Sequence, residues 1–148
     1  YTEGMIGAVA GYFSFPKGGF DTAFSPDKPP QYLAQMVILG RVHALFSHQE
    51  AFLRRGDLLP GPKMHAKVTD QPAYEFPTGQ PNRRVLARKM PGERKWLITA
   101  WAADGIEGPA AVEIPELGPV TLQARAAGSV YTAALQDGKP VLRQVDAG

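Results

Sequence analysis

Two carboxylates near the start of the sequence could take part in acid–base chemistry. Glu3 precedes an apolar run that extends from Met5 to Phe15, and Asp21 follows that run in a glycine-containing loop. Barrel enzymes place their acids and bases at the ends of buried parallel strands, and hydrolysis of a glycosidic bond needs two carboxyl groups. The simpler interpretation is that Glu3 is an unstructured terminal residue and that Asp21 hydrogen-bonds its own backbone in a turn.

Aromatic residues supply candidate surfaces for a sugar ring. Tyr12 and Phe20 lie close in sequence to the two carboxylates and could stack against a sugar. Trp96 and Trp101 are five residues apart on one predicted strand, so their side chains point to opposite faces. We expect one of them to fill the core. The other, for which Trp101 is the candidate, either covers a contact with the helical section or lies on an open sugar-binding face.

Other kinds of reactive site are disfavoured by the residues that the chain has. It contains no cysteine, which excludes disulfides, thiolate metal sites and a cysteine nucleophile. His43 and His48 would point about 140° apart around a helix, and His65 stands alone, so we predict no metal site. Neither a Gly-x-Ser-x-Gly elbow nor a phosphate-binding glycine motif occurs. We therefore expect no cofactor.

Charge narrows the choice of partners. The formal net charge is +2, which is too small for a nucleic-acid-binding domain. No apolar run reaches the roughly 18 residues that a transmembrane helix requires, so we expect no membrane partner. Composition leaves both an exported bacterial protein and a cytoplasmic one open.

A basic cluster predicts an exposed edge strand that charge protects from pairing with another chain. The cluster comprises Arg83, Arg84, Arg88, Lys89, Arg94 and Lys95.

The run from Met5 to Phe15 predicts a strand. It is apolar nearly throughout, ends in aromatic residues and stops at Pro16. A short continuous apolar run of this kind is typical of a strand buried on both faces, as in parallel sheets, although a buried helix would fit its first half. If it is a parallel strand, Glu3 and Asp21 flank its two ends.

Residues 31 to 55 predict one long helix. Tyr32, Met36 and Leu39 repeat at helical spacing, and the first half is apolar around most of its circumference. Such a helix must be covered on more than one side. Gly56 suits the left-handed residue that often follows a helix. This helix cannot be stable alone and needs a covering partner.

The remainder divides into a linker and a β-domain. Residues 57 to 82 are rich in Pro and Gly and predict a wrapped linker, with a short strand near residues 73 to 76. From Arg83 onward, turn signals recur at short intervals between strand-like segments, and Asp137-Gly138 predicts a tight hairpin. The predicted strands cover residues 85–90, 96–101, 111–114, 120–125, 129–133 and 141–145.

This order of elements resembles the end of a glycoside hydrolase. There, the last strand and helix of a (β/α)8 barrel lead into a C-terminal β-sandwich. Residues 85 to 101 look like the opening hairpin of such a tail, and Gly128-Ser129-Val130-Tyr131 looks like a segment near its end. Tyr1-Thr2-Glu3-Gly4 is similar to segments near the catalytic face of some barrels. The resemblance implies that Glu3 is a catalytic carboxylate whose partner is not identified.

The expected fold is α+β: a barrel-end-like strand, loop and helix over 1–56, a linker over 57–82 and an antiparallel β-sandwich over 83–148. The resemblance implies a non-catalytic C-terminal region that supports a catalytic barrel, without a complete active site of its own. Because the sequence begins at Tyr1 rather than Met, we expect more chain upstream. The expected partner is the remainder of a larger polypeptide or a second copy. The alternative is a free-standing β-sandwich that binds a carbohydrate or a protein.

Overall fold

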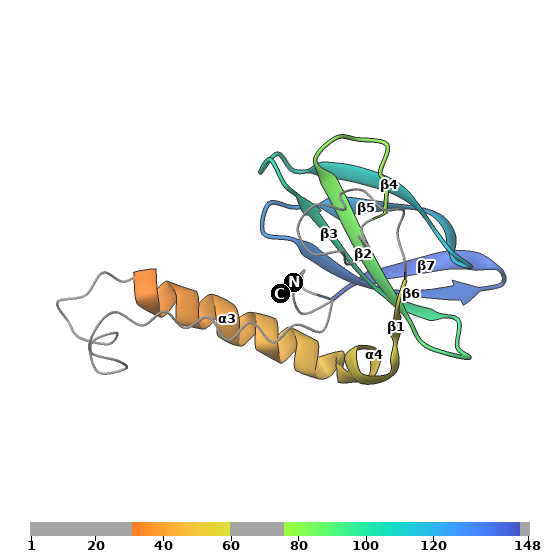
Figure 1. Cartoon of the computed structure of the whole chain (residues 1–148), viewed down its shortest axis with the longest axis horizontal. Helices are drawn as coiled ribbons and strands as arrows, with labels where there is room; N and C mark the ends of the chain where they lie inside the picture. The colour runs from red at the N-terminus through yellow and green to blue at the C-terminus, as the bar shows by residue number, and fades with distance from the viewer. Residues whose placement is uncertain (1–30, 60–75, 146–148) are drawn as a thin grey trace, which may run out of the picture.

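The computed structural model describes residues 31–59 and 76–145, and they form a β-rich domain with a helical arm (Figure 1). The arm consists of α3 (Gln31–His48), α4 (Glu50–Arg55) and β1 (Asp57–Leu58). Six longer strands follow: β2 (Arg83–Lys89), β3 (Lys95–Ala102), β4 (Gly108–Ile114), β5 (Gly118–Ala124), β6 (Ser129–Gln136) and β7 (Lys139–Gln144). The antiparallel, β-rich character predicted for residues 83 to 148 is confirmed. The predicted strand at residues 5–15 lies outside the described residues.

The strands form two sheets that face each other. One sheet has the order β1-β2-β3-β6-β7, and the other is the β4-β5 hairpin. All neighbouring strands are antiparallel. The β6-β7 hairpin turns through Asp137 and Gly138, whose φ angles of 51° and 75° are left-handed, as the Asp-Gly signal predicts for a two-residue loop. The arrangement is sandwich-like.

The main core lies between the two sheets. Buried and exposed residues alternate strictly along β4, because successive side chains of a strand point to opposite faces. Trp96 and Ile98 of β3 and Leu122 of β5 belong to this core and are almost completely buried. The Tyr131 hydroxyl spans the two sheets: it lies 3.1 Å from both the Gln123 amide nitrogen and the Gln123 carbonyl oxygen.

The larger sheet is buried on its second face as well. Leu86, Leu97 and Val130 point away from the main core and form a second apolar cluster with Phe46 of α3. Partly buried residues pack around it: Val42, Leu45, Phe52, Leu53, Trp101 and Val145. We call this group the arm cluster. Burial on both faces explains why β2 and β3 show long buried stretches rather than alternation.

The helix predicted over residues 31–55 is interrupted. Gln49 has φ −107° and ψ 17° and separates α3 from the six-residue α4. The prediction of a left-handed Gly56 is wrong, because its φ is −78° and its ψ is 138°. The chain passes directly into extended β1 instead of turning, and the Gly56 amide donates to the Phe52 carbonyl at 2.9 Å.

Gly56 is required for a different reason, which gives a testable prediction. A Cβ atom added there would lie 2.4 Å from the Phe52 carbonyl oxygen, whereas one added at Gly40 would meet nothing within 4 Å. We expect Gly56→Ala to destabilise the protein by more than about 1 kcal/mol. Gly40→Ala, within α3, should be neutral or stabilising by about 0.5–1 kcal/mol. Urea unfolding of both variants measures this, and equal effects would contradict it.

The prediction of a charged edge strand also needs correction. β2 is not at the edge of its sheet, because β1 pairs with it at Lys89 and Arg88 and Phe76 bridges to Val85. Arg88 is buried, and its Nη1 donates to the Gly56 carbonyl at 2.7 Å. The linker is therefore partly ordered: β1 and Phe76 belong to the sheet, while residues 60–75 lie outside the described ranges.

Candidate functional site

The residues predicted to act on a sugar are distributed unevenly over the structure. Glu3, Tyr12, Phe20 and Asp21 lie outside the described residues. Trp101 is described: it is half-buried and packs against the arm cluster. Trp101 therefore lies at the contact with the helical section, which is one of the two positions that the sequence left open for it. A role for Trp101 in sugar binding stays a prediction.

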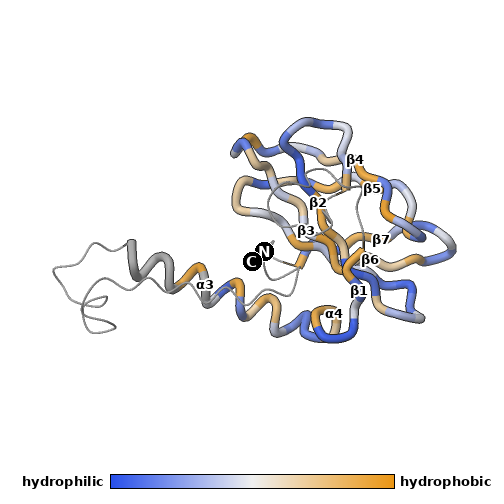
Figure 2. Tube along the Cα trace, viewed as in Figure 1, coloured by the Kyte–Doolittle hydropathy of each residue, from blue (hydrophilic) through white to orange (hydrophobic). Residues whose placement is uncertain are grey.

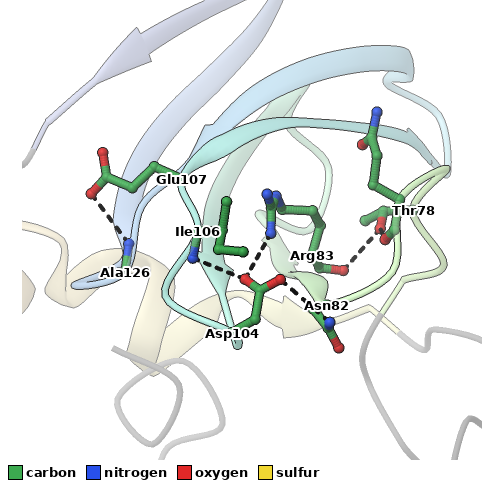
Figure 3. Close-up of polar contacts among 8 residues, drawn as sticks. Thr78, Asn82, Arg83, Asp104, Ile106, Glu107 and Ala126 are labelled. Carbon is green, nitrogen blue, oxygen red and sulfur yellow. Dashed lines mark hydrogen bonds and ion pairs between the residues drawn. The ribbon is translucent and has the colours of Figure 1, made fainter.

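A connected group of polar residues centres on Asp104, in the β3-β4 loop (Figure 3). Its Oδ1 accepts hydrogen bonds of 3.0 Å from Arg83 Nη1 and from the Ile106 amide. Its Oδ2 accepts one from Asn82 Nδ2 at 3.3 Å. The Asn82 carbonyl in turn accepts from the Ala103 amide at 2.8 Å. Asp104 thus connects the start of β2 to the end of β3.

The same contacts decide what Asp104 can do chemically. The hydrogen bond from the Ile106 amide holds the pKa of the Asp104 carboxyl below its ordinary value. Partial burial acts against this, and the contacts with Asn82 and Arg83 act with it. A carboxyl with a lowered pKa and with both oxygens occupied is poorly suited to donate a proton near neutral pH. Its role is to hold the loop.

This role predicts a pH-dependent difference between the protein and an Asp104→Asn variant. Because the folded pKa lies below the unfolded one, the carboxylate stabilises the fold above the unfolded pKa. That contribution is lost as the pH falls through about 4 and then through the lowered folded value. The unchanged protein should therefore have a higher free energy of unfolding than the variant at pH 7, and this difference should be smaller at pH 3. A gap independent of pH would contradict the assignment.

Two further ion pairs lie at turns of the sandwich. Lys89 forms an ion pair with Glu116 in the β4-β5 turn, and its Nζ lies 6.0 Å from the centroid of the Trp96 ring. Lys95 pairs with Glu93 at 2.7 Å. Within residues 31–59 and 76–145, three or more potential metal ligands do not gather anywhere. Four residues of the basic cluster therefore take part in separate contacts: Arg83, Arg88, Lys89 and Lys95.

One shallow depression lies over the outer face of the small sheet. Its volume is about 430 Å³. Exposed Ala111 and Thr121 line it together with Gly79, whose amide donates to the Ala111 carbonyl at 3.3 Å. Glu113 is the only charged residue in its lining, which has no aromatic residue. This composition offers little to orient a sugar, because carbohydrate sites combine stacking rings with several polar groups.

The described aromatic side chains pack inside the protein or against the arm cluster. Phe46, Phe76, Trp96 and Tyr131 are buried, and Phe52 and Trp101 are half-buried against the arm cluster. The large exposed apolar residues of the described part are aliphatic: Val37, Ile38, Ile106 and Val141. The described surface therefore does not present the aromatic platform expected of a sugar-binding module.

The arm carries the most unusual surface. α3 extends away from the sandwich (Figure 1), and its described part carries hydrophobic residues among hydrophilic ones (Figure 2). Val37 and Ile38, adjacent near its middle, are 47% and 61% exposed. Among the described side chains of α3, those around Phe46 belong to the arm cluster. The sequence predicted an apolar helix that needs a covering partner, and that partner stays a prediction. The Asp104 contacts were not predicted, because they join Asp104 to Arg83 and Asn82, which lie 21 and 22 positions away in the chain.

Neither described helix has the length and hydropathy to cross a membrane. The chain matches no family model, no curated protein and no solved structure.

Proposed function

We propose that this chain is the non-catalytic C-terminal region of a carbohydrate-active hydrolase of the glycoside hydrolase type, in which the sandwich supports a catalytic barrel. The observation that carries the proposal is the arm: α3 leaves the sandwich with Val37 and Ile38 exposed. Adjacent exposed aliphatic residues on a projecting helix mark a contact surface. In this proposal residues 1–56 form the end of the barrel, and α3, which belongs to this segment, packs against the rest of the barrel.

The way in which the arm is attached supports a bracing role. Arm-cluster packing, the β1-β2 ladder and the Arg88–Gly56 hydrogen bond all join it to the large sheet. Burial lowers the pKa of Arg88, and the nearby charge of Asp57 opposes this effect. A guanidinium stays protonated under such conditions, so its charge-assisted hydrogen bond persists. These three attachments fix the end of the arm on the sandwich.

The sandwich itself is suited to support rather than to catalysis. The carboxylate of Asp104 is occupied by loop contacts, and Glu116 and Glu93 are paired with lysines. Catalytic carboxyl groups would then come from the barrel, with Glu3 and Asp21 as the candidates in this chain. The alternative, a free-standing carbohydrate-binding module, is less favoured because the described aromatic rings are buried or half-buried in packing.

Two properties of the purified chain test the proposal. We expect no turnover of a panel of aryl glycosides. We also expect concentration-dependent self-association in analytical ultracentrifugation, because the uncovered side of α3 is apolar. Val37→Asp should weaken this association, whereas His43→Asp, at an exposed position about 120° away around the helix, should not. Robust glycoside turnover, or a strictly monomeric chain, would argue against the proposal.

A further inference from the structure

The sequence contains two Asp-Gly pairs, Asp104-Gly105 and Asp137-Gly138. In such a pair the backbone nitrogen of the glycine can attack the side-chain carboxyl carbon of the aspartate, because glycine has no side chain that shields this nitrogen. The new C–N bond closes a succinimide ring, and the amide proton leaves with the carboxyl hydroxyl as one molecule of water. Water then opens the ring at either carbonyl group and yields aspartate or isoaspartate, in which the main chain runs through the former side chain.

The fold holds the reacting groups of the first pair in other contacts. The Gly105 amide, which would be the nucleophile, donates a hydrogen bond of 3.1 Å to the Ala102 carbonyl. Both oxygens of the Asp104 carboxylate accept hydrogen bonds. The bond from the Ile106 amide also lowers the pKa of this carboxyl, so the protonated form, whose hydroxyl can leave as water, is scarce at neutral pH. Neither reacting group is therefore available while the loop keeps this geometry.

The second pair forms the two-residue turn between β6 and β7. Gln136 and Lys139 are the last partners of the ladder, and the two turn residues between them have left-handed φ angles. Within the described ranges, the Gly138 amide donates no hydrogen bond and the Asp137 carboxylate accepts none. β7 is the last strand of the large sheet, and all four residues of the turn are exposed. The turn can therefore open without disturbing the other strands.

Exposure alone does not separate the two sites, since Asp104 and Asp137 are both exposed. The difference lies in the hydrogen bonds to the two groups that must react. We propose that Asp137 converts spontaneously to isoaspartate in the folded protein and that Asp104 is protected from this modification. Isoaspartate adds one carbon atom to the main chain of a turn whose length sets the register of β6 and β7. Since Leu135 and Leu142 of these strands pack against the main core, the modification also loosens this end of the sandwich.

Incubation of the full chain in neutral buffer for several weeks tests the assignment, with the chain unfolded in guanidinium chloride as the reference. Trypsin places the two sites in separate peptides, residues 96–125 and 126–143, because the bond before Pro140 resists cleavage. Mass spectrometry with electron-transfer fragmentation distinguishes isoaspartate from aspartate in each peptide. Asp137→Asn and Asp104→Asn are a matched pair of variants, in which the ring closes with loss of ammonia and the mass of the peptide changes. Circular dichroism checks that both variants keep their β-structure.

In the folded chain we expect isoaspartate to accumulate several-fold faster at Asp137 than at Asp104, whereas the unfolded chain should show similar rates at the two sites. Asp137→Asn should likewise lose ammonia several-fold faster than Asp104→Asn. Similar rates at the two sites of the folded chain, or a faster reaction at Asp104, would overturn the inference. Isoaspartate that forms at Asp137 only in the unfolded chain would overturn it too, because the turn would then protect its own aspartate.

Discussion

Replacing Trp96 with alanine is expected to lower the free energy of unfolding by about 3–5 kcal/mol, the usual cost of removing a large aromatic side chain from a core. Trp96 is fully buried between the two sheets and is among the largest buried side chains. Its strand, β3, is the middle strand of the large sheet. The cavity would therefore open where the sandwich is least able to collapse around it.

Trp101→Ala is the matched control for this prediction. Trp101 lies on the same strand, but it packs against the arm cluster and is only half-buried. Its loss should cost clearly less and should leave the core between the sheets intact. Urea unfolding followed by far-ultraviolet circular dichroism compares the two variants on equal terms. If Trp101→Ala were the more damaging change, the assignment of the two faces of β3 would be wrong.

Leu97→Ala is expected to cost about 2–5 kcal/mol and also to loosen the arm. Leu97 is fully buried in the arm cluster with Leu86, Val130 and Phe46. The resulting cavity would lie between the sheet and the helices, so the loss should fall mainly on the attachment of the arm. Limited proteolysis should then cut within residues 49–58 faster than in the unchanged protein.

Two controls make the Leu97→Ala prediction specific: the variant Val141→Ala and a double-mutant cycle. Val141 is 43% exposed on β7, and its loss should change stability by no more than about 0.5 kcal/mol. Phe46→Ala combined with Leu97→Ala should be non-additive, because residues in contact share the energy that either change removes. Strict additivity would show that α3 does not pack on Leu97.

The β-domain was predictable because its signals are local. Buried and exposed residues alternate along β4 and β5, and Asp137-Gly138 marks a two-residue turn whose residues both have left-handed φ. Each of these features depends only on residues close together in the chain, so hydrophobic period and turn chemistry were sufficient to find them.

The features that the sequence did not reveal depend on distant residues. Arg88 looked like a surface charge, but the Gly56 carbonyl, 32 positions away, accepts its hydrogen bond in a buried position. Gly56 looked like a left-handed helix end, but close approach to Phe52 is what requires it. Asp104 did not stand out in the sequence, because Asn82 and Arg83 contact it only in the folded chain.

The coding sequence immediately upstream of Tyr1 tests most directly whether this chain is the supporting end of a larger hydrolase. We predict an open reading frame that continues upstream for the roughly 200 or more residues of a (β/α)8 barrel, with carboxylates at the ends of its predicted strands. A start codon directly before Tyr1 would contradict the account, and so would a start codon separated from Tyr1 only by a secretory signal sequence. It would favour a free-standing module instead.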